Sequence, residues 1–277
     1  MDHLTDEQWE QFERDGYTFL GKLLDDEQLA ALQKRMDDIM MGEADVDYDR
    51  MMMQLDSDTG NYADVGEQTR GHKGPTLNYR KIEDLEWDPR FLEYMQRPLF
   101  REICARAYDE DTPVGCFRAM FVNKPASGGT VLPWHQDRWT FLDRDPQVTI
   151  WTALDPATRE NGCVRIIPGS HRELVNPDQL SGFLTEEQAE QHCSDSEKAV
   201  DIVLEAGEVC LLHNWSLHSS DVNRSEQSRR AFSACYMDAR TQNTDGRPTE
   251  YSVVLGEGAL SVSDTGKVEA PAGLGAS

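Results

Sequence analysis

The sequence predicts a mainly β protein, built as a sandwich or barrel of short strands with helices packed outside it. From Val114 onward, short β-type runs alternate with turns rich in Gly, Pro, Asn and Asp, a pattern typical of sandwiches and barrels. Before about residue 110, capping signals and apolar residues at helical spacing dominate. Because 277 residues can bury one full core, we expect a single domain over residues 1–277, helical over about 1–110 and β over about 111–240.

Two capping boxes open the helical part, Thr5-x-x-Gln8 and Asp25-x-x-Gln28. The first helical unit is expected to hold the aromatic residues Trp9, Phe12 and Tyr17. The second box precedes an apolar face made of Leu29, Leu32 and Met36. We therefore expect these helices to pack on the outside of a sheet.

A polar segment from Asp45 to Gly74 is predicted to be a long loop, either a functional lid or a disordered excursion. Beyond it, the stretch from Phe91 to Tyr108 is predicted to be helical. Its apolar residues recur at helical spacing and indicate a core stripe, made of Leu92, Met95, Leu99 and Ile103.

The predicted strands are short runs bounded by turn residues. They cover residues 117–122, 148–154, 164–167, 202–204, 209–212 and 231–236. A third capping signal, Thr185-x-x-Gln188, predicts a small helix inserted between strands. After about Gln242 the chain is rich in Gly, Ala, Ser and Thr, and we expect a mobile tail over about 265–277.

The charge of the chain limits its partners. A formal net charge of -24 argues against nucleic acid, whose phosphates are bound by clustered Lys and Arg. The charge also counts mildly against a tight surface site for an acyl-CoA, and it is interpreted as a solvated surface. A local basic pocket inside an acidic protein stays compatible with it.

Other features of composition predict a cytoplasmic protein without a membrane partner. The sequence has no uninterrupted apolar stretch near the roughly 18 residues that a membrane span needs, and its first residues lack signal-peptide character. The six cysteines show no paired spacing such as C-x-x-C and are interpreted as reduced packing residues. The sequence does not indicate an oligomeric state.

The most informative motif is Trp134-His135-Gln136-Asp137-Arg138-Trp139. On an extended strand, His135 and Asp137 would point to the same face and could chelate one metal. Two histidines and one carboxylate on one side of an octahedral Fe(II) form a facial triad that leaves positions open for cosubstrate and oxygen. The motif therefore predicts a third ligand downstream.

Two histidines are candidates for that ligand. His213 and His218 are five residues apart, so on one regular strand they would face opposite sides and only one would easily join the site. Eleven residues beyond His218 lies Arg229, on the next predicted strand. A guanidinium there could hold the distal carboxylate of a dicarboxylate cosubstrate, and because Arg230 would face the other way, only one of the two should point inward.

At this point the sequence resembles the phytanoyl-CoA dioxygenase family of non-haem Fe(II), 2-oxoglutarate-dependent oxygenases, from about Leu4 to about Asp238. The motifs that carry the resemblance are His135-x-Asp137, Trp151-Thr152-Ala153-Leu154-Asp155, Glu160-Asn161-Gly162-Cys163, Pro168-Gly169-Ser170-His171, and His218-Ser219-Ser220 followed by Arg229. Each motif alone is weak, but their order and spacing together are specific. The resemblance implies a double-stranded β-helix core of the jelly-roll, cupin-like type.

The resemblance also implies roles at matching positions. His135, Asp137 and His218 are expected to bind Fe(II), and His171 is expected to be a turn residue or a neighbour of the ligands. The residues expected to contact 2-oxoglutarate are Arg229, Ser220, Trp151, Met120 and Lys81. Apart from the resemblance, the residues that flank the metal motif, Trp134, Arg138 and Trp139, are candidates for the substrate pocket, with Arg138 placed to bind an anionic group. Because related halogenases have a small residue where this chain has Asp137, hydroxylation is favoured over halogenation.

Three classes of function follow. The leading hypothesis is a dioxygenase that uses Fe(II), 2-oxoglutarate and O2 to hydroxylate a small-molecule substrate, with release of succinate and CO2. The second is a cupin-like metal enzyme of another reaction type, which would have no need for Arg229. The third is a non-catalytic binding protein on the same fold. Because the family acts on acyl-CoA esters, osmolytes, phosphonates and natural products, the resemblance does not imply a preference for phytanoyl-CoA.

Overall fold

The computed structural model describes residues 3–194, 198–249 and 251–271. Its α-helices are α1 (Asp6–Asp15), α2 (Asp26–Met41), α3 (Pro89–Met95), α4 (Pro98–Tyr108) and α5 (Glu186–Cys193), with short 3-10 helices at Tyr62–Asp64, Leu85–Trp87 and Ser170–Arg172. Its strands are β1 (Tyr17–Lys22), β2 (Met52–Leu55), β3 (Thr69–Arg70), β4 (Tyr79–Ile82), β5 (Val114–Lys124), β6 (Leu132–His135), β7 (Val148–Ala153), β8 (Val164–Ile166), β9 (Val200–Asp201), β10 (Glu208–His213), β11 (His218–Ser220), β12 (Arg229–Asp238), β13 (Val253–Leu255), β14 (Ser261–Val262) and β15 (Val268–Glu269).

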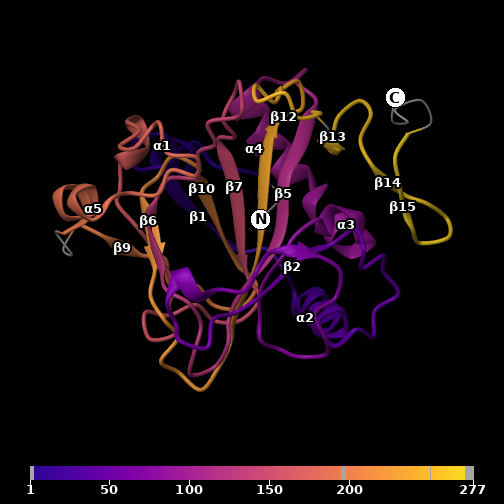
Figure 1. Cartoon of the computed structure of the whole chain (residues 1–277). Coiled ribbons are helices and arrows are strands. Elements are labelled where there is room, and N and C mark those ends of the chain that lie inside the picture. Colours follow the sequence, from indigo (N-terminus) through magenta and orange to yellow (C-terminus); the bar gives the residue numbers. More distant parts are fainter. Residues whose placement is uncertain (1–2, 195–197, 250, 272–277) are drawn as a thin grey trace.

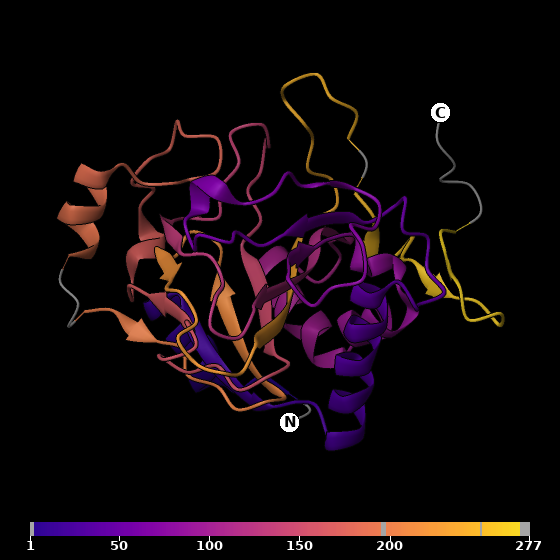
Figure 2. The same ribbon diagram turned by 60° about the horizontal axis from the view of Figure 1, so that its bottom comes forward.

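Two antiparallel sheets form the centre of the molecule. The larger has the strand order β1-β10-β7-β12-β5-β4-β2-β3, with β13 paired to β5, and the smaller has the order β6-β11-β8-β9. Helices α2, α3 and α4 lie on one side of the large sheet, and β6, β9 and α5 lie on the other (Figures 1 and 2). The mainly β prediction with helices packed outside is therefore confirmed.

The central strands of the large sheet are buried on both faces, and side-chain alternation along them supplies both cores. On β7, Val148 and Ile150 belong to the helix-side core, while Trp151 and Ala153 belong to a second cluster shared with the small sheet. All six residues of β7 are buried. A strand buried on both faces is a nearly continuous apolar run, which is why this segment was recognisable in the sequence.

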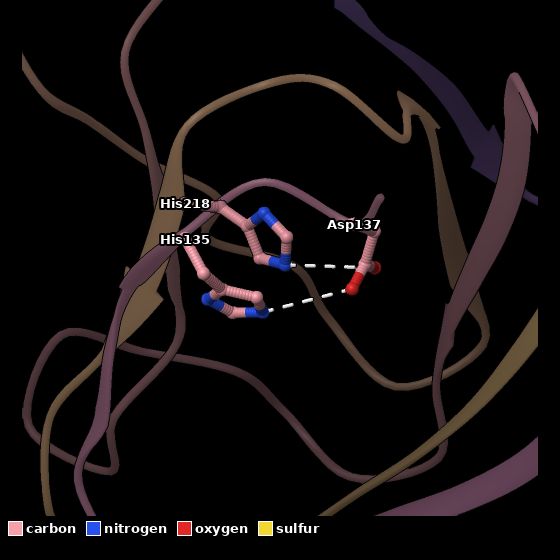
Figure 3. Close-up of side chains that lie close together, drawn as sticks. All are labelled: His135, Asp137 and His218. Carbon is pink, nitrogen blue, oxygen red and sulfur yellow. Dashed lines mark ion pairs between the residues drawn. The ribbon is translucent and has the colours of Figure 1, made fainter. Parts of the chain in front are cut away.

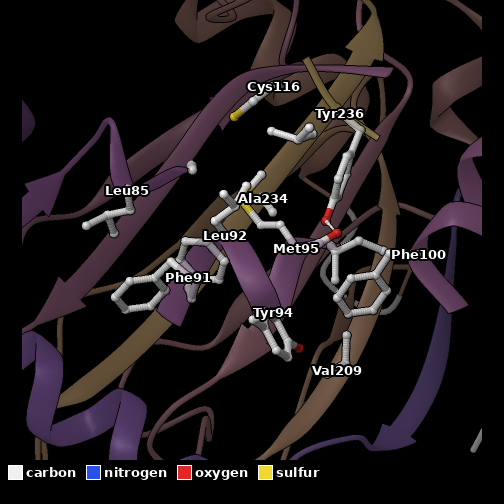
Figure 4. Close-up of a cluster of buried hydrophobic side chains, with 14 of the residues drawn as sticks. Leu85, Phe91, Leu92, Tyr94, Met95, Phe100, Cys116, Val209, Ala234 and Tyr236 are labelled. Atoms are coloured by element: carbon white, nitrogen blue, oxygen red, sulfur yellow. Dashed lines mark hydrogen bonds between the residues drawn. The ribbon is translucent and has the colours of Figure 1, made fainter. Parts of the chain in front are cut away.

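The helix-side core packs α3 and α4 against β12 (Figure 4). Phe91 and Phe232 have ring centroids 4.7 Å apart, and the Tyr236 hydroxyl donates a hydrogen bond of 2.9 Å to the Met95 carbonyl. The predicted stripe over the helical stretch is buried throughout. The stretch divides into two helices because Pro98 begins α4 and has no backbone N–H to continue α3.

The N-terminal part is less helical than predicted, because it also contributes four strands to the large sheet. Gly16, at a φ of 80°, ends α1, and Tyr17 then pairs with Leu212 as the first residue of β1 rather than extending the helix. The polar segment predicted as a loop likewise contains β2 and β3. These strands are two to six residues long and gain their order from pairing with distant strands.

Two further predictions differ from the structure. The sequence predicts a strand at residues 202–204, but in the structure the strand at this place is β9, which ends at Asp201. Leu204 forms only an isolated bridge with Ala157. The predicted mobile tail contains β15, paired with β14, while residues 272–277 lie outside the described part. The inserted helix α5 and its capping box at Thr185 are confirmed.

No helix in the described part of the chain is long and apolar enough to cross a membrane. All six cysteines are buried and free, as expected for packing residues.

Candidate metal centre

The three predicted metal ligands converge at the small sheet. His135 ends β6, His218 begins β11, and the two residues are register partners on neighbouring antiparallel strands. Asp137 lies two residues beyond β6, and its carboxylate faces both imidazoles (Figure 3). Its Oδ1 is 3.7 Å from His135 Nε2, and its Oδ2 is 3.8 Å from His218 Nε2. Among the described residues this is the one group of three such side chains whose potential ligand atoms lie within 4.8 Å of one another.

Hydrogen bonds orient both imidazoles. His135 Nδ1 donates to the Pro133 carbonyl at 2.8 Å, and His218 Nδ1 donates to the Ser216 carbonyl at 2.9 Å. With its proton on Nδ1, each ring presents an unprotonated Nε2 toward Asp137. Burial, followed by the nearby His218, lowers the pKa of His135 to about 3, so this ring is neutral at physiological pH. Two imidazoles and one carboxylate suit a divalent first-row metal such as Fe(II).

The position of Asp137 corrects the sequence argument. The prediction placed both ligands of the H-x-D motif on one strand, but β6 ends at His135. Backbone hydrogen bonds beyond the strand hold the carboxylate in place: Gln136 N donates to the Gly182 carbonyl at 3.1 Å and Asp137 N to the Asn214 carbonyl at 2.7 Å. The side chains of His135 and Asp137 therefore point to the same place because backbone hydrogen bonds to Gly182 and Asn214 hold the segment beyond β6.

His213 and His218 do not share one regular strand, which was the basis for expecting them on opposite faces. His213 instead ends β10, and a turn separates it from His218 in the other sheet. The His213 ring packs near His171, with centroids 4.9 Å apart, and near Phe12 at 5.8 Å. Burial lowers the pKa of His213 to about 4. His171 bonds to the Glu13 carbonyl at 3.1 Å, so neither ring belongs to the three-ligand cluster.

A cavity of about 320 Å³ opens beside the three ligands. All five residues predicted to contact the cosubstrate line it: Arg229, Ser220, Trp151, Met120 and Lys81. Of the three predicted substrate-pocket residues, Trp139 lines this cavity, whereas Trp134 and Arg138 are absent from its wall. Arg138 instead donates to the Pro177 carbonyl and lies 3.6 Å from Asp145, so its charge is directed elsewhere.

Arg229 is a buried cation without an anionic partner in the described chain. Its exposed fraction is 4%, and its Nε is buried with no hydrogen-bond partner. Its guanidinium lies 5.6 Å from the centroid of the Trp151 ring. Burial lowers the pKa of Arg229 to about 10, which still leaves it charged at neutral pH. Burying an unpaired charge is costly, so this arrangement fits a cavity that receives an anion.

The neighbouring arginine has the opposite environment. Arg230 donates to both carboxylate oxygens of Asp155, at 2.8 and 2.9 Å, and to Asp37 at 2.5 Å. Because adjacent residues of a strand face opposite sides, β12 directs Arg229 into the cavity and Arg230 away from it.

Sequence reasoning missed three basic residues in the cavity wall, which are Arg80, Arg118 and Lys124. Lys124 is 4% exposed, donates to the Thr130 carbonyl, and is the register partner of Arg229. Alternation along β5 could have revealed two of them, because Arg118, Met120 and Lys124 share one strand face. No local pattern could have placed Arg80 beside these residues, because Arg80 lies on β4, which becomes a neighbour of β5 only by strand pairing.

Comparisons with known proteins agree with this geometry. The phytanoyl-CoA dioxygenase family model matches residues 12–231. Phytanoyl-CoA dioxygenase domain-containing protein 1 of Danio rerio is 28% identical over 284 residues, which cover 91% of this chain and 95% of that protein. The peroxisomal phytanoyl-CoA dioxygenase of Homo sapiens is 26% identical over 61% of this chain and 52% of its own length.

Solved structures share the fold at low sequence identity. EctD from S. alaskensis with bound Fe has a TM-score of 0.65 and 20% identity, covering 88% of this chain and 82% of that one. The non-heme alpha ketoglutarate dependent carbocyclase SnoK has a TM-score of 0.62 and 17% identity, covering 90% and 93%. The predicted jelly-roll core is thereby confirmed. Because the family match spans most of the sequence, including every candidate ligand, the chain belongs to the phytanoyl-CoA dioxygenase family.

Proposed function

We propose that this protein is an Fe(II)- and 2-oxoglutarate-dependent dioxygenase that hydroxylates a C–H bond of a small molecule. One observation carries the proposal: a cluster of two histidines and one aspartate shares a cavity with Arg229, a buried cation whose Nε has no partner in the described chain. The donor set fits Fe(II), and the unpaired guanidinium fits the far carboxylate of 2-oxoglutarate. We also propose that the chain forms one oxygenase domain, because the large sheet draws strands from β1 through β13.

The residues of this chain have separable tasks in that reaction. His135, Asp137 and His218 would hold the metal, and the Nδ1 hydrogen bonds of both histidines would keep their rings in the binding orientation. Arg229 would bind the distal carboxylate, with the buried hydroxyl of Ser220 lining the same cavity. When bound, Fe(II) and 2-oxoglutarate supply the oxidising chemistry, using O2 and releasing succinate and CO2.

The cavity walls would exclude water and orient the reactants. Trp151 and Trp139 are each 4% exposed, and the Phe183 ring stacks on His135 with centroids 4.8 Å apart. A dry, shaped site strengthens the charge-assisted hydrogen bond between Arg229 and a carboxylate. The carboxylate at Asp137 completes a three-residue ligand set, which favours hydroxylation over halogenation.

The test is succinate release from 2-oxoglutarate under air, with Fe(II) and a panel of candidate metabolites. Substrate-triggered succinate, together with a product heavier by one oxygen atom, is the expected result. His135→Ala and Asp137→Ala should abolish it, because either change removes a metal ligand. His192→Gln, on the exposed side of α5, is the matched control and should keep full activity.

Two outcomes would support the alternatives. Turnover that needs metal but proceeds equally well without 2-oxoglutarate would favour a metal enzyme of another reaction type, for which Arg229 has no use. Binding of metabolites without turnover in any condition would favour a non-catalytic protein. Retained iron-dependent turnover in the Asp137→Ala variant would refute the assignment of the metal site.

A further inference from the structure

The charge of the cavity is opposite to the charge of the whole chain. The protein carries a formal net charge of -24, yet among the charged residues that line the cavity Asp137 is the one carboxylate. The basic residues in the wall are Arg80, Lys81, Arg118, Lys124 and Arg229. A concave site lined by one sign of charge concentrates ligands of the other sign. The cavity is therefore suited to anions. The cosubstrate would supply one free carboxylate, at its distal end, for these five basic residues.

Two of these basic residues, Arg118 and Lys124, lie toward opposite ends of one face of β5. Lys124 is the register partner of Arg229, whereas Arg118 lies six residues back along β5, opposite Cys235 of β12. At about 3.3 Å per residue, the two backbone positions on β5 are roughly 20 Å apart. The carbon chain of 2-oxoglutarate has four carbon–carbon bonds of about 1.5 Å each. A dicarboxylate bound between the metal and Arg229 spans at most about 6 Å, so its distal carboxylate does not need Arg118 as a partner.

Arg118 has unused hydrogen-bonding capacity at the cavity wall. Its nearest carboxylate in the described chain is Glu83, at 3.7 Å, and Glu83 is shared with Lys81, whose Nζ is closer at 3.0 Å. Two cations thus share one anion. No hydrogen bond donated by the five guanidinium N–H groups of Arg118 occurs within the described chain.

Aromatic rings hold the Arg118 guanidinium in position. It lies 4.6 Å from the ring centroid of Trp139 and 5.2 Å from that of Phe117, and these two rings are themselves 4.3 Å apart. Such stacking fixes the plane of the guanidinium and leaves its edge available to an anion. Trp139 is two residues beyond Asp137, and both line the cavity, so this platform and the proposed metal ligand belong to the same cavity wall.

We propose that Arg118 binds an anionic group of the substrate, a carboxylate or a phosphate, in the same cavity as the metal. This inference rests on the proposed function, because it assigns Arg229 to the cosubstrate. Arg118 thereby takes the role that the sequence suggested for Arg138, which is paired with Asp145 and does not line the cavity. A cavity of about 320 Å³ is near the lower limit for ligand pockets, so the substrate, or the part of it that enters, is small.

Binding of simple anions tests this site without knowledge of the substrate. The full-length protein is loaded with Zn(II) as an inert metal and saturated with 2-oxoglutarate, and acetate and inorganic phosphate are titrated separately by calorimetry. We expect saturable binding of at least one of them, and the stronger of the two identifies the chemistry of the group. Arg118→Gln should bind that anion roughly tenfold to a hundredfold more weakly, because a charge-assisted hydrogen-bonding partner is lost. Arg118→Lys should recover part of the affinity.

Arg138→Gln is the matched control and should bind the anion as the wild type does. The proposal is overturned if neither anion binds saturably, if Arg118→Gln binds as tightly as the wild type, or if the anion displaces 2-oxoglutarate. Binding of 2-oxoglutarate is measured first, in the same instrument, for every variant. Its failure in the wild type would count against the proposed function, whereas its retention in Arg118→Gln shows that this variant is folded and that any lost affinity concerns the second anion.

Discussion

At the scale of single residues, the decisive contrast is between two adjacent arginines on β12. Arg230 is neutralised by Asp37 and Asp155, whereas Arg229 is buried without a carboxylate partner in the described chain. Their sequence context is nearly the same, so their difference comes from strand parity and from what each side chain meets. An unpaired buried cation is destabilising unless a ligand compensates it, which makes Arg229 informative about the ligand.

Replacing Arg229 should therefore weaken cosubstrate binding selectively. Arg229→Gln removes a charge-assisted hydrogen-bonding partner worth about 1.5–3 kcal/mol, so the Kd for 2-oxoglutarate should rise roughly tenfold to a hundredfold. Calorimetry with a Zn(II)-loaded protein measures this directly. The paired change Arg230→Gln should leave that Kd nearly unchanged, and an equal loss in both variants would contradict the assignment.

Lys124 should make cosubstrate binding depend on pH. Burial, followed by repulsion from Arg229 and Arg80, lowers the pKa of Lys124 to about 6 when no anion is bound. Above that pH the amine is mostly neutral, and a bound carboxylate would restore its proton. The affinity for 2-oxoglutarate should then be constant below about pH 6 and fall by up to about tenfold per pH unit above it.

Calorimetry in two buffers with different heats of ionisation detects the accompanying proton uptake. Lys124→Met and Lys124→Arg should both lose the proton uptake and the pH slope, because neither has a group that titrates in this range. Lys124→Arg, which stays charged, should retain affinity, whereas Lys124→Met should bind more weakly. Binding of 2-oxoglutarate by the wild type without proton uptake would refute this prediction.

At the scale of elements, the strands of the large sheet divide their side chains between stability and chemistry. On β12, Phe232, Ala234 and Tyr236 face the helix-side core, while Arg229 and Ser233 line the cavity. The same alternation predicts that His135 and Asp137 of the H-x-D motif share a face. In that case the strand ends at His135, so strand alternation does not determine the position of Asp137. Periodicity predicted the long strands well, because their patterns repeat. It failed for β1 to β4, which are short and ordered by partners distant in sequence.

Because the two faces are separate, a change in the helix-side core should reduce stability and spare the site. Phe91 is fully buried on α3 against Phe232. Phe91→Ala should lower the free energy of unfolding by about 3–5 kcal/mol through lost burial and a residual cavity. Chemical denaturation measures this loss. Phe19→Ala, at a side chain that is 37% exposed, should cost far less, and comparable losses would contradict the packing described for α3.

At the scale of the whole molecule, an acidic protein encloses a basic cavity. The negative charge lies on the surface, where water screens it, whereas the cavity cations come from β4, β5 and β12, which lie side by side in the large sheet. The proposed metal ligands come from the small sheet and the segment that follows β6. Cosubstrate and metal would thus bind between the two sheets.

Metal binding should therefore stabilise the whole fold. Since the ligand cluster joins β6 to β11 and forms only when the chain is folded, a metal at one hundred times its Kd adds about 2.7 kcal/mol. Thermal denaturation with Zn(II) should raise the Tm by several degrees, and a chelator should reverse the gain. Asp137→Ala should not respond, while His192→Gln should respond as the wild type does. An equal gain in Asp137→Ala would place the metal elsewhere.

The sequence by itself determined the helix caps, the long strands, the ligand types and the family, because each depends on local spacing or on motifs in a fixed order. Only the tertiary structure decided that Asp137 reaches the candidate metal site from beyond its strand, that Arg138 is engaged elsewhere, and that Arg80, Arg118 and Lys124 meet in one cavity. The physical reason is that cavity walls are made by strand register and sheet order. Residues such as Arg80 and Lys124 become neighbours through pairing between strands, which no local pattern in the chain encodes.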